Sequence, residues 1–313
     1  MMAMAVCSSH GGGREIRRAS GGMVRVPSRR SRIGLVFLCL SVMLPLQTGR
    51  ADVAQSVSQA AVPEPIRGKG YSLVQNWDFG VSIRDEAELR KHFYTRYVYA
   101  NGKLDHLKDE WQRYRDEGNH VFHDGTLALV ARANGALKPG EIESGMLRSK
   151  WTGRYGYYEI RMKVPAGRGL WPAFWLNPED QKWPPEIDVV EIVDNGRDTS
   201  RASFHILHGL GAKDAPVNFT RLNKWGAYRP GVDYADGYHV FAVEWTEEGV
   251  RHYVDDVLVA DRAFQWKHDD GTDGGAAHVL VNLAVGGQWP GPPVDLSVFP
   301  ASLEIDYVRV WQR

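Results

Sequence analysis

Three acidic residues lie within six positions of an otherwise apolar stretch, PPEIDVVEIVDN, at residues 184–195. Acidic residues are unfavourable in a strand, and like charges on one face repel each other. In a regular strand, residues two apart share a face, so Glu186 and Asp188 point the same way and Glu191 points to the other side. A β-bulge after Asp188 absorbs one residue and returns Glu191 to the face of the other two acids. The pattern therefore predicts a bulged strand with three carboxylates on one face.

Such a trio of carboxylates fits acid–base chemistry. With the bulge, four strand steps separate Glu186 from Glu191, about 13 Å between their Cα atoms. Side chains that lean together would bring the carboxyl groups to about 5–5.5 Å, the spacing of a retaining glycosidase and too close for the water of an inverting one. Asp188 can hydrogen-bond one glutamate and help keep one carboxyl protonated while the other is ionised. The alternative is a solvated acidic strand face.

Aromatic residues near the acids favour the catalytic alternative. Trp171 and Trp175 are four positions apart, so in a regular strand they share a face on which a sugar ring can stack. Packing in the core is the alternative for Trp175, whose neighbours at 173–176 are apolar. Trp289 lies in the glycine-rich segment 285–291 without apolar neighbours to bury it, and it is a candidate sugar platform.

The elements around these residues are mostly strands. Runs of β-branched and aromatic residues between Gly, Pro and Asp predict strands at 239–245, 250–260, 278–285 and 303–311. Two polar stretches, 85–97 and 104–115, have helical spacing and predict short helices or long ordered loops. Many short strands without βαβ alternation predict an all-β sandwich of two antiparallel sheets, and the size of the domain favours a jelly roll over an immunoglobulin-like sandwich.

The N-terminus has the pattern of a secretory signal. Basic residues precede an apolar run of 14 residues at 33–46, which is shorter than the roughly 20 residues that span a bilayer. A small-x-small tripeptide then predicts cleavage after Ala51, with an uncleaved membrane anchor as the alternative. We therefore predict a signal peptide at 1–51, a flexible leader at 52–70 and one domain at 71–313, in a protein that is secreted or periplasmic.

Charge and motif content exclude several classes of function. The whole chain has 38 Lys and Arg against 38 Asp and Glu, but residues 1–51 contain eight of the basic and one of the acidic residues, which leaves 30 against 37 and a net charge of −7. An acidic domain disfavours nucleic-acid and anionic-membrane partners. Both cysteines, Cys7 and Cys39, fall within the predicted signal, which excludes thiol catalysis and disulfides after cleavage. No P-loop, G-x-S-x-G or H-E-x-x-H motif is present, and we expect a monomer.

The chain resembles the family 16 glycoside hydrolases, of the laminarinase and β-glucanase kind, over about residues 77–313. The resemblance rests on GYYEIRMKVP with LWPAFWL, EIDVVE, DGYHVFAVEWTEEGVRHYVDDVLV, NLAVGGQWPG and LEIDYVRVW. The family's catalytic motif in its bulged form is E-x-D-x-x-E, which this sequence contains. The resemblance implies that Glu186 is the nucleophile, Asp188 its electrostatic helper and Glu191 the general acid/base. It also implies a β-jelly roll with a glycan-binding cleft across its concave sheet.

The resemblance implies further residues less directly. In FHILHG, His208 matches a histidine that many relatives have beside the acid/base, and His205 lies close enough to confuse the choice. Asn282 and the three tryptophans named above match positions that line the family's cleft. Asp306 matches a residue that contributes to a structural calcium in many relatives, although a plain surface role is the alternative. No organic cofactor and no catalytic metal is expected.

Substrate preference in this family is set by loops, and residues 104–118 match no typical laminarinase. The resemblance implies a retaining endo-glycosidase that hydrolyses a β-1,3 or mixed β-1,3-1,4-glucan by double displacement. A depolymerase of bacterial exopolysaccharide or galactan is an alternative substrate assignment. A non-catalytic carbohydrate-binding protein on the same fold is the alternative from another class.

Overall fold

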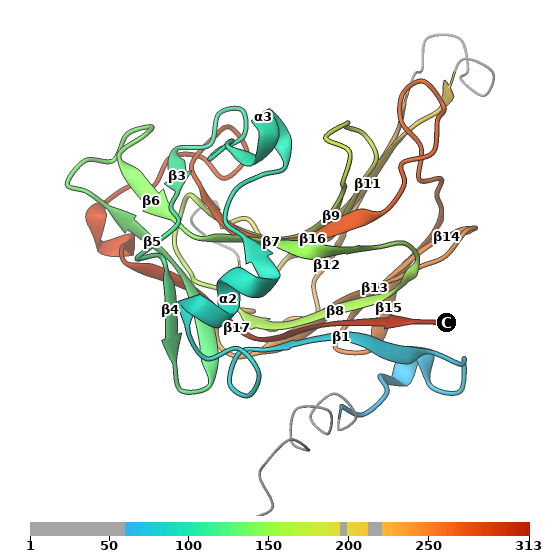
Figure 1. Cartoon of the computed structure of the whole chain (residues 1–313). Helices are drawn as coiled ribbons and strands as arrows, with labels where there is room; N and C mark the ends of the chain where they lie inside the picture. The colour runs from blue at the N-terminus through green and yellow to red at the C-terminus, as the bar shows by residue number, and fades with distance from the viewer. Residues whose placement is uncertain (1–59, 195–198, 212–220) are drawn as a thin grey trace, which may run out of the picture. The chain divides into compact units, whose positions relative to one another are not determined.

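Two largely antiparallel sheets lie face to face, and the C-terminus lies at the end of a strand of one of them (Figure 1). The computed structural model describes residues 60–194, 199–211 and 221–313, which all belong to one unit spanning 49–313. The predicted signal peptide, with both cysteines, lies outside the described residues. Among the residues that are described, no helix is long and apolar enough to cross a bilayer. The fold is the predicted all-β sandwich.

The ten-stranded sheet forms one layer. Its order is β15 (Val257–Ala263), β14 (Gly249–Val254), β13 (His239–Trp245), β8 (Gly156–Lys163), β17 (Ala301–Gln312), β5 (Thr126–Ala133), β6 (Ile142–Ser144) and β3 (Gln112–Tyr114). In addition, β1 (Ser72–Asp78) pairs with β17, and β4 (His120–His123) pairs with β5.

The seven-stranded sheet forms the other layer and carries the acidic strand. Its order is β12 (Arg221–Tyr228), β11 (Ala202–Gly209), β10 (Glu186–Glu191), β9 (Leu170–Pro178), β16 (Ala277–Val285), β7 (Met146–Gly153) and β2 (Phe93–Tyr94). Every residue of β16 is buried, which explains why its sequence is a nearly continuous apolar run. The main core fills the space between the sheets and includes Phe174, Ile187 and Val243.

The predicted strands are present, with one difference. The run at 250–260 is two strands, β14 and β15, joined by a hairpin at Asp255 and Asp256. Both aspartates have positive φ, 47° and 65°. A two-residue hairpin requires this conformation at both central positions, and Asp tolerates it better than most residues do.

The two polar stretches near the start fold differently from each other. The first contains α2 (Glu86–His92), whose N-cap Asp85 accepts a hydrogen bond from the Glu88 amide at 2.8 Å. The second, residues 104–115, is a long ordered loop that ends in β3, so the loop alternative holds there. Its backbone amides bond partly within the segment, as from Glu110 to Leu107, and partly to other elements. For example, the Trp111 amide donates to the Val285 carbonyl oxygen at 2.8 Å.

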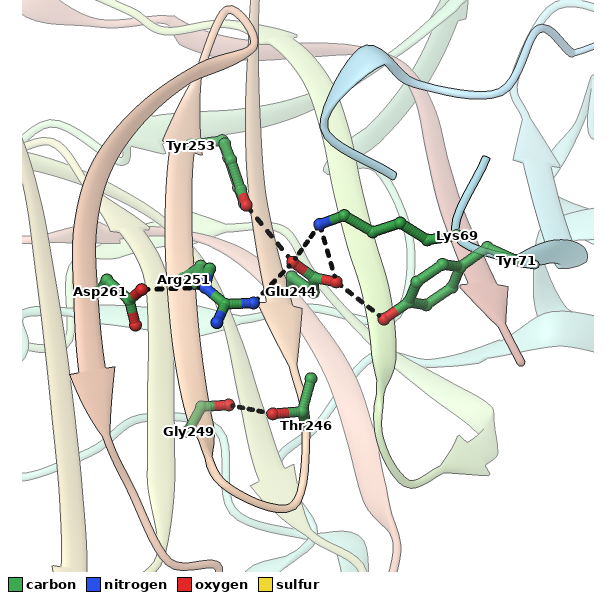
Figure 2. Close-up of polar contacts among 8 residues, drawn as sticks. All are labelled: Lys69, Tyr71, Glu244, Thr246, Gly249, Arg251, Tyr253 and Asp261. Carbon is green, nitrogen blue, oxygen red and sulfur yellow. Dashed lines mark hydrogen bonds and ion pairs between the residues drawn. The ribbon is translucent and has the colours of Figure 1, made fainter. Parts of the chain in front are cut away.

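The segment before β1 packs on the outer face of the ten-stranded sheet. Ile66, in the short helix η2 (Glu64–Ile66), is fully buried in a cluster with Tyr157 and Trp311. Part of the range predicted as a flexible leader is therefore ordered and packed. Figure 2 shows the polar contacts that hold this segment on the sheet.

The buried carboxylate of Glu244, on β13, is the centre of those contacts. It accepts hydrogen bonds from Lys69 Nζ and from the Tyr71 hydroxyl, each at 3.1 Å, and from Arg251 Nη1 and the Tyr253 hydroxyl, each at 3.3 Å (Figure 2). Two of these donors come from the N-terminal segment and two from β14. The carboxylate therefore ties the segment to the sheet.

Candidate active site

The predicted bulge is present in β10 and aligns the three acids. Asp188 pairs with His205 on β11 and with Trp175 on β9. Glu191, three residues later, pairs with residues only two positions away on both neighbours, Ser203 and Ala173. One residue of β10 is therefore extra, and Glu191 returns to the face of Glu186 and Asp188. All three acids line one pocket with a volume of about 300 Å³.

Glu186 is held by aromatic and cationic neighbours. The indole of Trp183 donates a hydrogen bond to Glu186 Oε2 at 2.9 Å, and His205 Nδ1 lies 3.7 Å from Oε1. Burial raises the pKa of Glu186, while His205, Trp183 and Lys108 act in the opposite direction. Of the three acids, this is the one whose surroundings favour the ionised form most.

Asp188 is buried between the two glutamates and contacts His205. Its Oδ2 lies 2.7 Å from His205 Nδ1. Burial raises the pKa of Asp188 well above its usual range, and the charge of Glu186 adds to the effect. The hydrogen bond between Asp188 and Glu186 also raises the pKa of Asp188 and lowers that of Glu186, which favours the ionised form of Glu186.

Glu191 has one oxygen bound and one oxygen free. The indole of Trp171 donates to Glu191 Oε1 at 3.0 Å, whereas the buried Oε2 has no hydrogen-bond partner among the described residues. Burial, followed by the charges of Asp188 and Glu186, raises the pKa of Glu191 well above the usual range. A raised pKa favours the protonated form, and Oε2 is the oxygen that is free to contact a bound ligand.

The site thus contains an ionisable carboxylate and a protonated carboxyl in one pocket. A nucleophile must be ionised and a general acid must carry a proton, so the two roles need environments that push the pKa values apart. The donors around Glu186 and the like charges around Glu191 supply this difference. The arrangement suits glycosyl transfer.

Aromatic rings continue from the acids across the seven-stranded sheet. The His205 ring stacks on Trp225 with centroids 3.9 Å apart and an interplanar angle of 12°. Trp289 lies edge-on to both Trp225 and Trp171, at 5.3 Å in each case. Trp225 is 51% exposed and Trp289 is 36% exposed, so part of each side chain is open to a ligand. The predicted platform Trp289 is part of this aromatic row.

Trp175 and Asn282 line the pocket, but their polar side-chain groups are hydrogen-bonded to other protein groups. Trp175 is 6% exposed, and its indole donates to Asn282 Oδ1 at 2.7 Å. Asn282 Nδ2 in turn donates to the Tyr114 hydroxyl at 2.9 Å. Both residues line the pocket as predicted, but their hydrogen bonds link β9, β16 and β3 to one another.

The structure places His205, and not His208, beside the acids. His208, predicted to bind substrate, does not line the pocket: its Nδ1 lies 2.7 Å from the Gly209 carbonyl oxygen, and its ring contacts Phe264. His205, three positions earlier, contacts the acids. Residues three apart point to opposite faces of a strand, so only one of the two can face the acids.

Sequence reasoning missed several residues of the pocket. Trp183 precedes Glu186 by three positions, and its proximity to the acids was a usable signal. Tyr99, at the start of α3 (Tyr99–Gly102), and Lys108, in the loop at 104–115, reach the pocket from far away in the sequence, and no local pattern indicates this. Lys108 Nζ lies 5.5 Å from the ring centroid of Trp183, which is hydrogen-bonded to Glu186. The loop at 104–115, for which typical laminarinases offer no match, therefore contacts a residue that holds Glu186.

One cluster of described residues could offer ligands to a metal ion, and it coincides with the acids of the site. Among the described residues, Glu186, Asp188 and His205 offer ligand atoms within 4.8 Å of one another, and these are the candidate catalytic residues themselves. Asp306 forms an ion pair with Arg161 at 2.6 Å. One oxygen of the Asp306 carboxylate, Oδ2, is occupied in this way, and a calcium-binding role for Asp306 stays a prediction.

A bulged strand with paired carboxylates, inside a β-sandwich and beside an aromatic row, defines a glycoside hydrolase. Comparison with known proteins agrees. Residues 107–309 match the family model "Glycosyl hydrolases family 16". The chain is 36% identical over 258 residues to a beta-glucanase of Rhodothermus marinus, which covers 76% of this chain and 79% of the relative. The chain therefore belongs to glycosyl hydrolase family 16, and it is a glycoside hydrolase of the endo-β-glucanase type.

One further relative is longer than this chain, and two further similar proteins have solved structures. Endo-1,3-1,4-beta-glycanase EglC of Rhizobium meliloti is 34% identical over 195 residues, which cover 60% of this chain but only 38% of that relative. The laminarinase catalytic domain of Thermotoga maritima superposes with a TM-score of 0.60 at 28% identity, covering 78% of this chain and 98% of that chain. The laminarinase of Rhodothermus marinus has a TM-score of 0.60 at 29% identity, covering 77% and 97%.

Proposed function

We propose that this protein is a retaining endo-glycosidase that hydrolyses a β-1,3 or mixed β-1,3-1,4-glucan. The observation that carries the proposal is the contrast between the two glutamates of β10. Glu186 receives hydrogen bonds and positive charge, whereas Glu191 is buried with a free oxygen beside other acids. Family membership supports the reaction class.

The mechanism we propose is double displacement. Ionised Glu186 attacks the anomeric carbon, and Glu191 donates its proton to the leaving glycosidic oxygen, which gives a covalent glycosyl-enzyme. Glu191, now ionised, removes a proton from a water molecule that attacks the same carbon and releases the sugar with retained configuration. Asp188 and the Trp183 indole hold Glu186 in place, and the Trp171 indole orients Glu191.

Two observations support a glucan substrate. The similar proteins named above are described as a beta-glucanase, an endo-1,3-1,4-beta-glycanase and laminarinases. The exposed faces of Trp225 and Trp289 suit the C–H faces of glucose units. Other relatives are described as a kappa-carrageenase and a keratan-sulfate endo-1,4-beta-galactosidase, so galactan remains the second substrate to test.

The test is reducing-sugar release by residues 52–313 on laminarin, mixed-linkage β-glucan, agarose, carrageenan and bacterial exopolysaccharide. The matched variant is Glu186→Gln, which keeps the shape and removes the nucleophile. We expect activity on laminarin or mixed-linkage glucan that the variant loses. Binding to a polymer without any cleavage by the wild type would replace the hydrolase with the non-catalytic alternative.

We also propose that the protein is exported and acts outside the cytoplasm as a monomer. The basic and apolar pattern at 1–51 supports export. N-terminal sequencing of the mature protein should begin at Asp52. An N-terminus that retains the apolar run at 33–46 would favour the membrane anchor instead.

A further inference from the structure

A second pocket lies near β2, an edge strand of the seven-stranded sheet. It has a volume of about 450 Å³ and is lined by nine residues. Four of them are cationic, Arg90, Arg96, Lys103 and Lys150, and one is acidic, Asp116. We call this the basic pocket. Four cations against one acid give it a local charge of +3, although residues 52–313 carry a net charge of −7.

The acid in the basic pocket is already engaged. Asp116 forms an ion pair with Arg96 at 2.9 Å and accepts a hydrogen bond from the Thr95 hydroxyl. Arg90 and Lys150 contact neutral groups, the Thr95 hydroxyl and the Arg90 carbonyl oxygen. Among the described residues, no ion pair forms with Arg90, Lys103 or Lys150. Their charge is available to a ligand.

A fifth cation, Arg148, is buried beside the basic pocket. Arg148 is 6% exposed, yet it has no ion-pair partner in the described part of the chain. Its Nε donates to the Arg96 carbonyl oxygen at 2.9 Å, and its Nη1 lies 3.2 Å from His278 Nε2. Burial and the Arg148 charge lower the pKa of His278 to about 4, so this ring is neutral. A buried cation with only neutral partners is costly, and an anion nearby would stabilise it.

The guanidinium of Arg148 lies near two residues of the basic pocket. It stands over the Tyr94 ring, 4.3 Å from the centroid. A Cβ added to Gly102 would lie 3.5 Å from Nη2. Gly102 has a φ of +75°, which favours glycine, and the absence of a side chain leaves Nη2 uncovered there. An anion in the pocket could therefore reach Nη2 beside Gly102.

One segment joins the basic pocket to the active site. Thr95, Arg96 and Lys103 line the basic pocket, while Tyr97 and Tyr99 line the pocket of the catalytic acids. Across the sheet, β10 and β2 are four strands apart in the order β10, β9, β16, β7, β2. At about 4.8 Å per strand, the separation is about 19 Å. A polysaccharide several sugar units long can span both pockets.

We propose that the basic pocket binds an anionic substituent, a carboxylate or a sulfate ester, on the polysaccharide chain, several sugar units away from the bond that is cleaved. This inference rests on the proposed function, because the polymer must also occupy the catalytic pocket. The substrate preferred by the enzyme is then an acidic polysaccharide, and a neutral glucan lacks one of the contacts.

The test compares three forms of one polymer: laminarin, lightly carboxymethylated laminarin and lightly sulfated laminarin. Light substitution leaves neutral stretches for the catalytic pocket. The variant is Lys103→Gln with Lys150→Gln, which removes two exposed cations and leaves buried Arg148 in place. The matched control is Arg67→Gln with Lys163→Gln, which removes the same charge elsewhere. Binding is also measured by calorimetry in a Glu186→Gln background.

We expect the wild type and the control to have a KM on one or both acidic polymers about three- to ten-fold below that on laminarin, with similar kcat. The double variant should lose this difference and keep its KM on laminarin. About 0.5 M NaCl should also reduce the difference, because salt screens exposed charges. The polymer that shows the effect distinguishes a carboxylate from a sulfate.

Equal KM values on all three polymers for the wild type, or an unchanged preference in the double variant, would overturn the inference while leaving the glucanase assignment intact. If laminarin is not cleaved at all, the proposed function fails. The calorimetric comparison then still decides whether the basic pocket binds acidic polymers.

Discussion

The indole of Trp171 donates a hydrogen bond to one oxygen of Glu191 and leaves the other oxygen without a partner. The bond fixes the orientation of the carboxyl group. It also favours the ionised form, against the burial and like charges that raise the pKa of Glu191. Trp171 thus orients the acid and offsets part of the rise in its pKa.

Trp171→Phe should therefore move the alkaline limb of the kcat/KM profile to higher pH. The active enzyme needs protonated Glu191, and without the Trp171 donor its pKa rises further. A pH–rate profile of both proteins measures the shift. Trp289→Phe is the control, since Trp289 contacts Trp171 by its ring. An alkaline limb unchanged by Trp171→Phe would mean that Glu191 does not control it.

His205→Gln should lower kcat/KM, by about 10²-fold if the acids lose their alignment. His205 contacts Asp188 at 2.7 Å and stacks on Trp225. His208→Gln should change kcat/KM by less than about two-fold and lower only the melting temperature, because His208 packs against Phe264 away from the acids. Steady-state kinetics with thermal unfolding separate the two cases. Equal kinetic losses in both variants would contradict the assignment of faces on β11.

Glu244→Gln should destabilise the fold by about 1–3 kcal/mol without changing kcat, because hydrogen bonds to a buried carboxylate are weakened. Burial acts to raise the pKa of Glu244, but hydrogen bonds and charge from Lys69, with the Tyr71 and Arg251 donors, lower it overall. A lowered folded-state pKa adds stability above the usual carboxyl pKa, and this stability is lost as the pH falls through the folded value. Urea unfolding at several pH values should show the wild-type advantage disappear in acid.

Glu110 should show the opposite pH dependence. Burial raises its pKa to about 7, while the Leu107 amide and Gln112 donate to it. The folded state then holds the proton more tightly than the unfolded state, so stability falls as the pH rises from about 4.5 to 7. Glu110→Gln should remove this decline. Parallel stability curves for the two proteins from pH 5 to pH 8 would show that Glu110 titrates normally.

Local sequence patterns predicted the features that depend on strand periodicity. The spacing of Glu186, Asp188 and Glu191 required a bulge to place them on one face, and the bulge is present. The even spacing of Trp171 and Trp175 placed both in the pocket. For these residues, the alternation of side chains along one strand was sufficient.

Features that depend on contacts between distant segments could not be predicted in this way. Lys108 lies in a loop and Tyr99 begins α3, and both line the pocket of the acids. Tertiary hydrogen bonds, such as that between the Tyr99 hydroxyl and Asn177, fix their positions. The choice between His205 and His208 depended on the register of β11 against β10, which a single sequence does not specify. The hairpin at Asp255 was hidden in a run that looks like one strand.

Double displacement requires Glu186 and Glu191 to act together, and it leaves the anomeric configuration unchanged. Proton NMR can follow the anomeric signal of the new reducing end during the first minutes of laminarin hydrolysis, before mutarotation. The β-anomer should appear first, and the α-anomer should follow slowly. Initial appearance of the α-anomer would show inversion in a single step and would contradict the nucleophilic role of Glu186.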